Sequence, residues 1–205
     1  MAGLTGKKAV VVGGGTGIGQ AIARGLAEAG AEVAIGGRRE STLKETATGT
    51  SMLTHTIDVA CRDSTNAFFK WATEQFGQID ILVNAAGVNI KQRSMAEMSP
   101  EQWDQVLAIN ATGAYNCMHA VLPAMRARRA GTILNVSSIA GKRAIALGGI
   151  AYSASKFAMT ALGTCVANEV APDGVRVTNV YPGEVNTPIL ENRPTPVDEA
   201  HRQRI

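Results

Sequence analysis

The stretch Val12-Gly13-Gly14-Gly15-Thr16-Gly17-Ile18-Gly19 decides the fold. It follows an aliphatic run at residues 9–12, and a helical pattern begins near Gln20. A glycine-rich turn between a strand and a helix lets the backbone approach a pyrophosphate, which the helix N-terminus stabilises with amide donors and a positive dipole end. The stretch therefore predicts a dinucleotide-binding turn, with a purely structural turn as the alternative. A P-loop is disfavoured because no Lys–Ser/Thr pair closes the run.

Outward from this turn, short aliphatic runs alternate with segments of helical spacing. The predicted strands are residues 9–12, 32–35, 53–57, 79–83, 132–136 and 175–180, and the two longest predicted helices are residues 101–128 and 151–170. Continuously apolar strands that alternate with helices are typical of a parallel sheet covered on both faces. The pattern predicts an α/β fold with a doubly wound parallel sheet, of which six strands are recognisable.

The composition fits one folded domain over residues 1–205, with 45% hydrophobic and 18% charged residues. The net charge is only +3, and the densest basic run (Arg126, Arg128 and Arg129) ends a predicted helix. Positive charge stabilises a helix C-terminus. We interpret the run as a solvated helix end rather than a nucleic-acid contact, because no stacking aromatic residues accompany it.

Cysteine and histidine residues form no recognisable ligand pattern. The three cysteines and the three histidines are scattered along the chain, without a CxxC pair or a disulfide framework. No secretory apolar core stands at the N-terminus, and no apolar run approaches the ~18 residues that span a bilayer. We expect no metal, no membrane partner and a cytoplasmic location.

Three further segments follow predicted strands at the edge where ligands bind in open α/β sheets. The second strand is followed by Arg38 and Arg39, where an acidic residue would receive the ribose hydroxyls of NAD. An arginine there can instead meet a 2′-phosphate, which favours NADP(H), although a solvated helix start is the alternative. Asp58, followed by Val59, either accepts a hydrogen bond from an adenine amino group or only forms a turn. The fourth strand is followed by small residues beside the expected cofactor crevice, Asn84-Ala85-Ala86-Gly87.

Tyr152 and Lys156 stand four residues apart at the start of a predicted helix. This spacing places them on one helix face. A free tyrosine has a pKa of roughly 10, and a nearby ammonium group lowers that pKa toward the range useful for proton transfer. Alone, the pair is also compatible with an ordinary helix surface.

Two polar residues complete a candidate site. Ser138 follows the fifth strand and can hold a substrate oxygen against Tyr152, although a turn-forming serine is the alternative. Asn110 lies inside the long predicted helix, where asparagine is a poor helix former. We expect its side chain to bond backbone or a water and to interrupt the helix, unless it is merely a tolerated polar residue.

Together these residues resemble the short-chain dehydrogenase/reductase family in its compact single-domain branch. The resemblance extends from Lys7 to about Pro188, and it rests on the order and spacing of many individually weak motifs. The matching residues are Gly13, Gly17, Gly19, Asp58, Asn84 to Gly87, Asn110, Ser138, Tyr152, Lys156, Pro182, Gly183 and Thr187.

The resemblance implies a Rossmann fold and hydride transfer between a nicotinamide cofactor, preferably NADP(H) but possible with NAD(H), and a small alcohol or carbonyl substrate. Tyr152 then exchanges the proton, Lys156 lowers its pKa and bonds the nicotinamide ribose, Ser138 orients the substrate oxygen, and Asn110 holds a water. Four further residues are expected on the nicotinamide side: Pro182, Gly183, Val185 and Thr187. The resemblance also implies a homodimer or homotetramer. The alternative is a catalytically silent dinucleotide-binding or sensor protein with the same fold.

The C-terminal region departs most from the family pattern. After Thr187 the family has a substrate lid, a further helix and a final parallel strand, and no such helix or seventh strand is recognisable here. We expect residues 188–205 to form a partial lid or a disordered tail, and we favour truncation over a natural short form. The strand at residues 175–180 is then expected to form an exposed sheet edge.

Overall fold

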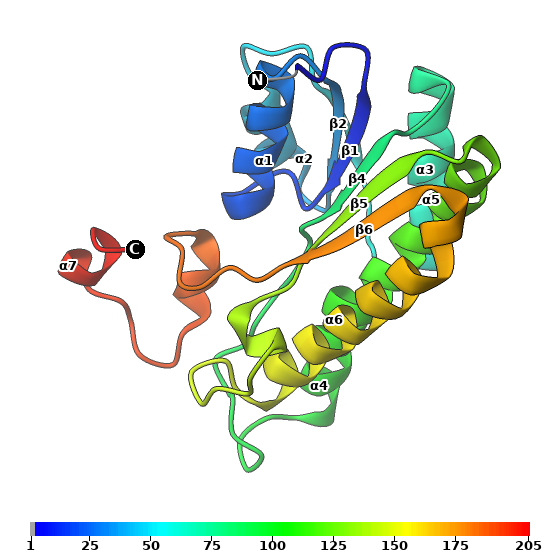
Figure 1. Ribbon diagram of the computed structural model, residues 1–205. Helices are drawn as coiled ribbons and strands as arrows, with labels where there is room; N and C mark the ends of the chain where they lie inside the picture. Colours follow the sequence, from blue (N-terminus) through cyan, green and yellow to red (C-terminus); the bar gives the residue numbers. More distant parts are fainter. Residues whose placement is uncertain (1–2) are drawn as a thin grey trace.

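A computed structural model describes residues 3–205, which form a six-stranded parallel sheet in the order β3-β2-β1-β4-β5-β6 (Figure 1). Every strand lies within two residues of its predicted bounds, and β6 forms an edge as expected. The doubly wound fold predicted from the sequence is therefore confirmed. The strands are β1 (Lys8–Val12), β2 (Glu32–Gly37), β3 (Leu53–Thr56), β4 (Ile81–Asn84), β5 (Gly131–Val136) and β6 (Val175–Val180).

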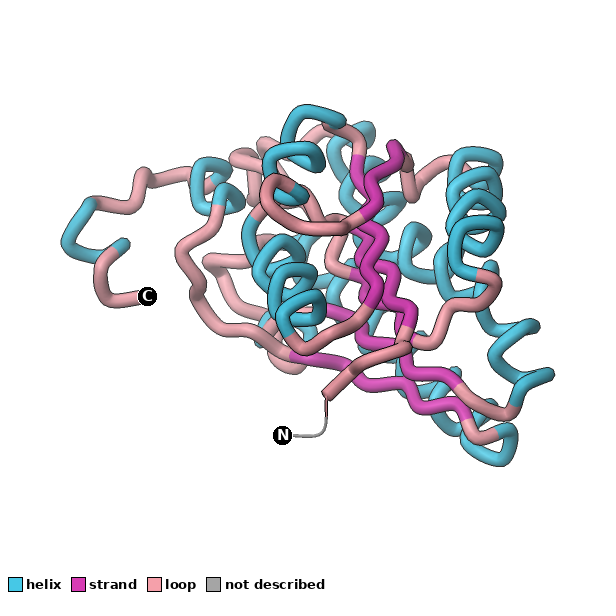
Figure 2. The backbone as a smooth tube through the Cα atoms, turned by 90° about the horizontal axis from the view of Figure 1, so that it is seen from above, coloured by secondary structure: helices cyan, strands magenta, loops and turns pink. Residues whose placement is uncertain are grey.

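Helices cover the two faces of this sheet in separate layers. One apolar cluster joins one face of the sheet to α1 and α2, and a second cluster joins the other face to α3, α5 and α6. Figure 2 shows the strands between these layers. Burial on both faces explains why the central strands β1 and β4 read as continuous apolar runs, whereas the edge strands β3 and β6 contain polar residues and are less buried. The helices are α1 (Gly17–Glu28), α2 (Glu40–Ala47), α3 (Arg62–Phe76), α4 (Pro100–Leu107), α5 (Gly113–Arg128), α6 (Ile150–Val170) and α7 (Glu199–Arg202).

The long helix expected over residues 101–128 is in fact two helices joined by a wider π-helical turn at Ala108–Thr112. A capping box starts α4: the side chain of Ser99 accepts from the backbone of Gln102, and the side chain of Gln102 accepts from the backbone of Ser99. Asn110 lies in the wider turn, so the expected break in regularity is confirmed. Such turns frequently occur at functional sites.

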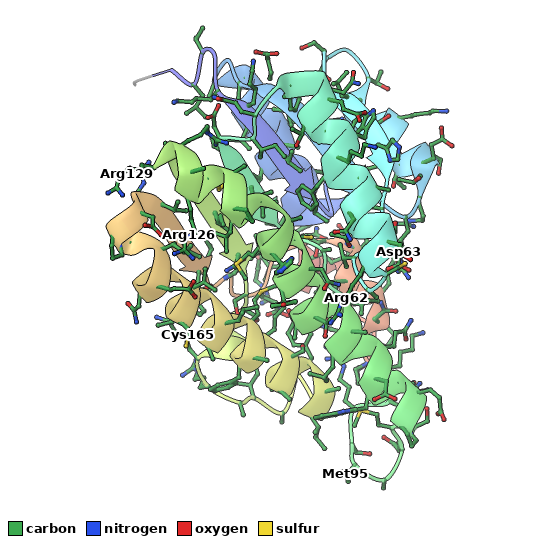
Figure 3. The ribbon with its side chains drawn as sticks, turned by 90° about the vertical axis from the view of Figure 1, so that its right-hand side faces the viewer. Arg62, Asp63, Met95, Arg126, Arg129 and Cys165 are labelled. Atoms are coloured by element: carbon green, nitrogen blue, oxygen red, sulfur yellow. The ribbon has the colours of Figure 1, made fainter. Side chains whose placement is uncertain are left out.

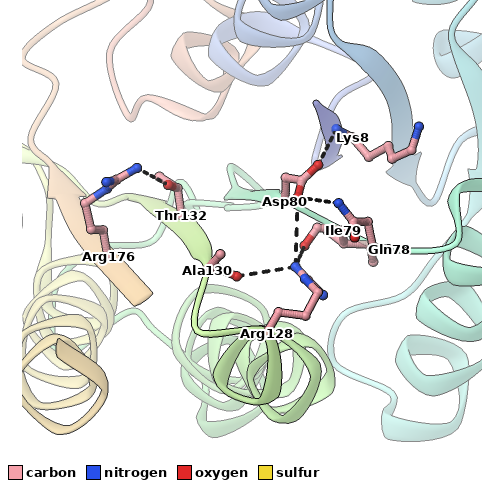
Figure 4. Close-up of polar contacts among 8 residues, drawn as sticks. All are labelled: Lys8, Gln78, Ile79, Asp80, Arg128, Ala130, Thr132 and Arg176. Atoms are coloured by element: carbon pink, nitrogen blue, oxygen red, sulfur yellow. Dashed lines mark hydrogen bonds and ion pairs between the residues drawn. The ribbon is translucent and has the colours of Figure 1, made fainter. Parts of the chain in front are cut away.

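The amino ends of the central strands meet at Asp80, whose side chain is 12% exposed (Figure 4). Its carboxylate accepts hydrogen bonds from the backbone N–H of Lys8 at 3.0 Å and from Gln78 Nε2 at 2.9 Å. Arg128 lies 4.0 Å from the same carboxylate and donates to the Ile79 carbonyl. This polar network fixes β1 and β4 at the end of the sheet opposite the glycine turn.

The three arginines that end α5 are bound within the molecule, and Figure 3 labels Arg126 and Arg129 at this end of the helix. Arg126 forms ion pairs with Glu169 at 2.8 Å and Asp173 at 2.7 Å, and Arg129 donates to the Pro172 carbonyl at 2.7 Å. The run therefore joins α5 to the end of α6 and to the sheet, which is a more specific role than a solvated helix end.

After β6 the chain leaves the carboxyl edge of the sheet and extends away from it (Figures 1 and 2). The segment forms a short 3₁₀ turn at Pro188–Asn192 and the four-residue helix α7. Among the helices described within residues 3–205, none combines the length and the apolar character that crossing a membrane requires.

Replacing Asp80 with alanine should lower the free energy of unfolding by about 1–3 kcal/mol, because it leaves a partly buried backbone N–H without its acceptor. Urea denaturation measures the change. Asp104→Ala, on the exposed face of α4, is the control and should change stability by less than about 0.5 kcal/mol. Equal effects of the two substitutions would contradict the structural role of Asp80.

Candidate active site

The glycine turn after β1 depends on very close backbone contacts. A Cβ atom at Gly13, whose φ is +83°, would lie 2.4 Å from the backbone nitrogen of Ala86. A Cβ at Gly19 would lie 2.1 Å from the Gly13 carbonyl oxygen. Only glycine fits at either position. The turn therefore packs directly on the Ala85–Ala86 backbone after β4, which brings two of the predicted cofactor segments together.

Helix α1 begins at Gly17, three residues before the predicted start, and Gly17 adopts a φ of +57° after the extended Thr16. The backbone N–H groups of Gly13 and Gly14 donate to the Gly36 carbonyl. The N–H groups in the first turn of α1 have no carbonyl partner within the helix, so they are suited to hold an anion. Thr187 lies against Gly17, so the segment after β6 reaches the same turn.

Arg38 and Arg39 lie at the carboxyl end of β2, where both are exposed. Arg39 precedes the first residue of α2. The position fits both a 2′-phosphate contact and the alternative of a solvated helix start.

Asp58 and Val59 both make contacts within the protein. One carboxylate oxygen of Asp58 accepts from the Ala60 N–H at 3.0 Å, so this residue forms a turn before α3. Val59 is 6% exposed and packs in the core, and its carbonyl accepts from Asn116 Nδ2 at 2.8 Å. The predicted cofactor contact of Val59 stays a prediction.

Tyr152 lies in the first turn of α6 beside Ser138, which follows β5. Burial raises the pKa of Tyr152, while a hydrogen bond with Ser138 and the charge of Arg93 lower it. The net direction is opposite to the lowering by Lys156 that the sequence suggested, because removal from water disfavours the phenolate more than the neighbours favour it. At neutral pH the structure therefore favours the protonated phenol.

Lys156 is 4% exposed, and its ammonium group donates to the Val136 carbonyl at 2.8 Å. The nitrogen lies 5.7 Å from the centroid of the Tyr152 ring. Burial lowers the pKa of Lys156 to about 8. A Cβ at Gly87 would lie 3.4 Å from this nitrogen and 3.5 Å from Asn110 Oδ1, so Gly87 leaves space where the two side chains meet.

Asn110 joins three segments of the site. Its amide oxygen accepts from the Val88 N–H at 2.8 Å, and its amide nitrogen donates to the Val88 carbonyl at 2.9 Å and to Ser155 Oγ at 3.0 Å. The side chain thus fixes the loop after β4 to α6, as part of the backbone-bonding role expected for it. The proposed water contact is a separate role.

Two contacts at this edge were not anticipated from the sequence. Asn84, Asn135 and Asn179 are partners in neighbouring strands and form a chain of amide hydrogen bonds of 2.9 and 3.1 Å. Arg93 lies beside the start of α6, where its backbone carbonyl accepts from the Ile150 N–H at 3.3 Å, and its charge acts on Tyr152. The three asparagines share only the position near a strand end, and the loop containing Arg93 has no periodic pattern, so neither contact could be predicted from a linear pattern.

The remaining predicted residues follow β6. The Pro182 carbonyl accepts from the Ile139 N–H at 3.0 Å, which joins this segment to the loop after β5. Gly183 is open on its Cβ side, and Val185 is 38% exposed. Within the described residues, no group of three potential metal-binding side chains is close enough to hold an ion.

The fold and this arrangement of Ser138, Tyr152 and Lys156 define a member of the nicotinamide-dependent oxidoreductases with an open α/β sheet. Comparison with protein families agrees, because residues 7–197 match the short chain dehydrogenase family. The chain belongs to the short-chain dehydrogenase/reductase family, which confirms the resemblance seen in the sequence.

The chain is 39% identical over 192 residues to glycine betaine reductase ATRR of Emericella nidulans, covering 91% of this chain but only 15% of that protein. It is 34% identical to an uncharacterized oxidoreductase of Staphylococcus epidermidis, covering 90% of this chain and 80% of the relative. A solved metagenomic short-chain oxidoreductase in complex with NADP is 38% identical, with a TM-score of 0.82, covering 89% of this chain and 84% of the other.

The residues present fit a nicotinamide dinucleotide. The glycine turn provides a backbone cradle that a Cβ would fill, and the helix N-terminus suits the pyrophosphate. The buried ammonium group of Lys156 lies at the same edge of the sheet. The buried oxygen Oδ1 of Asn84 has no hydrogen-bond partner within the described residues.

Gly163→Ala in α6 should destabilise the protein by about 1–3 kcal/mol, because its Cβ would lie 2.1 Å from Asn179 Oδ1 and 2.6 Å from Asn135 Nδ2. Thermal and urea unfolding test this. Gly25→Ala in α1 is the matched control, since no atom lies within 4 Å of its added Cβ, and it should be neutral or stabilising. A neutral Gly163→Ala would show that the asparagine chain is loosely packed.

Proposed function

We propose that the protein catalyses reversible hydride transfer between NADP(H) and a small alcohol or carbonyl compound, with Tyr152 as the proton donor or acceptor. The observation that carries this proposal is the position of Tyr152 beside Ser138 at the carboxyl edge of the sheet, one helical turn from the buried Lys156, whose nitrogen lies 5.7 Å from the centroid of the tyrosine ring. The complete set, with Asn110, favours an enzyme over a catalytically silent binding protein, which does not need all four residues.

The residues divide the chemistry as follows. The nicotinamide supplies or accepts the hydride when it is bound. Ser138 orients the substrate oxygen toward the Tyr152 hydroxyl, which donates its proton during reduction and accepts one during oxidation. Lys156 holds positive charge beside the phenol below a pH of about 8 and stabilises the phenolate left after donation. Asn110 holds the loop after β4 against α6. As proposed from the sequence, it also holds a water that connects Lys156 to solvent.

The preference for NADP(H) over NAD(H) is supported by Arg38, which is exposed at the end of β2 where an acidic residue would receive the ribose hydroxyls of NAD. The solved relative in complex with NADP agrees with this preference.

In the same proposal, the pyrophosphate binds at the turn from Gly13 to Gly19, and the nicotinamide binds at the Pro182–Thr187 segment.

Tyr152→Phe should reduce turnover by at least about 100-fold while cofactor affinity changes little, because the substitution removes only the hydroxyl that transfers the proton. Steady-state NADPH oxidation with a panel of ketones, aldehydes and quinones measures turnover, and calorimetry measures affinity. Tyr115→Phe, on an exposed part of α5, is the control. Substantial turnover by Tyr152→Phe would refute the proton-transfer role.

The same assay should show a pH dependence of defined sign. Because burial raises the pKa of Tyr152, the phenol predominates at neutral pH. Carbonyl reduction should therefore proceed at neutral pH and decline as the pH rises through the pKa of Tyr152, while alcohol oxidation should increase over the same range. If the rates of carbonyl reduction and alcohol oxidation both increased, or both decreased, with rising pH, this assignment would be contradicted.

Arg38→Leu should weaken NADPH binding by about 10- to 100-fold and leave NADH binding nearly unchanged, because only NADPH carries the phosphate that the guanidinium meets. Titration calorimetry with both cofactors measures this, and wild type should prefer NADPH. Arg62→Leu on α3 removes an exposed arginine elsewhere and serves as the control. Equal affinities of wild type for the two cofactors would reject the preference.

A further inference from the structure

Arg93 is held at the entrance to the candidate active site by carbonyl groups of three separate loops. Its Nε donates to the Ile90 carbonyl at 2.8 Å, one terminal nitrogen donates to the Leu147 carbonyl, and the other donates to the Asn192 carbonyl at 2.7 Å. A guanidinium group has five N–H donors, so two remain beyond these three contacts. The side chain is therefore fixed in direction and still able to bind a further acceptor.

The positive charge of Arg93 is not neutralised by an ion pair. Among the described residues, no carboxylate lies within 4.0 Å of its nitrogens, whereas the nearby Arg193 is paired with Glu184. Partial burial and the like charge of Arg193 lower the pKa of Arg93, yet an arginine remains charged at every physiological pH. A fixed, partly desolvated cation without a counter-ion is a strong site for an anionic group.

Arg93 also lines a cavity of about 440 Å³ formed by the loop before α6 and the segment after β6, with Leu147, Arg193, Pro196 and Asp198 among its lining residues. The backbone carbonyl of Arg93 accepts from the Ile150 N–H at 3.3 Å, two residues before Tyr152, so the cavity wall adjoins the turn of α6 that carries the reacting group. The charged residues of the lining are Arg93, Arg193 and Asp198.

We propose that the substrate is an oxo acid, or the corresponding hydroxy acid, whose carboxylate binds Arg93 while its carbonyl or hydroxyl group meets Tyr152 and Ser138. This proposal rests on the proposed function and specifies its substrate class. In the reduction, the carbonyl carbon receives a hydride from NADPH, the oxygen receives the Tyr152 proton, and the carboxylate is unchanged. Arg93 determines specificity and takes no part in the transfer itself.

Isosteric pairs of compounds isolate the effect of the carboxylate. Pyruvate, acetoacetate and levulinate are compared with 2,3-butanedione, 2,4-pentanedione and 2,5-hexanedione, in which a methyl group replaces one carboxylate oxygen. Wild type should prefer at least one acid over its neutral partner by about 10- to 100-fold in kcat/KM, the range of a charge-assisted hydrogen bond, with the difference in KM. The series also measures the spacing between Tyr152 and Arg93.

Three variants separate charge from loop anchoring. Arg93→Gln should abolish the preference for the acid, and Arg93→Lys, which keeps the charge, should retain part of it. Arg143→Gln, an exposed arginine of the loop before α6, should leave the preference intact. A purely structural role of Arg93 would lower the activity on both members of a pair equally, so an unchanged ratio in Arg93→Gln, or a wild type that favours the diketones, overturns the proposal.

Failure of this proposal can be distinguished from failure of the proposed function. If Tyr152→Phe keeps its turnover, the proton-transfer role fails, whatever the preference between acids and diketones. If none of the six compounds is reduced, the carboxylate site is tested by calorimetry, which measures the binding of the three acids to the protein with NADP⁺. Binding that is lost in Arg93→Gln supports the carboxylate site, and binding that is absent or unchanged overturns it.

Discussion

The hydrogen bond from the Lys156 ammonium group to the Val136 carbonyl joins α6 to the end of β5, and the geometry of the site depends on it. A buried charge is costly unless its donors are satisfied. Here a backbone carbonyl at the end of a strand provides that partner, so the sheet determines where the first turns of α6 lie. Tyr152, one helical turn earlier, is thereby placed against Ser138, which follows the same strand.

Burial acts on Tyr152 and Lys156 in opposite directions on the pKa scale but for one physical reason. A medium of low polarity disfavours the charged form of each group, so the pKa of the phenol rises and that of the ammonium group falls to about 8. The ordinary pKa values of tyrosine and lysine are close, so the two shifts separate them, and Lys156 loses its proton at a lower pH than Tyr152 does. The arrangement keeps a proton on Tyr152 and a charge on Lys156 near neutrality, as carbonyl reduction requires.

Rigid and adaptable parts of the site are built differently. The chain of Asn84, Asn135 and Asn179 crosses three strands, and Asn179 continues it into α6 by donating to the Thr160 carbonyl at 3.0 Å. This platform fixes the reacting groups relative to the sheet. The substrate side is formed by loops instead, and Arg93 is the side chain that holds three of them together. In this arrangement the strands and α6 hold the groups that transfer the proton, and the loops hold the groups proposed to select the substrate.

The sequence by itself determined the order of strands and helices, the glycine turn, and the pairing of Tyr152 with Lys156 on one helix face. These features depend on local periodicity or on single residue types, which a linear pattern contains. Tertiary structure alone decided the π-helical form of the break at Asn110, the sign of the Tyr152 pKa shift, the core position of Val59 and the contacts of Arg93. Each of these features depends on burial or on partners that are distant in sequence. Burial and distant partners are determined only when the chain has folded around the residue.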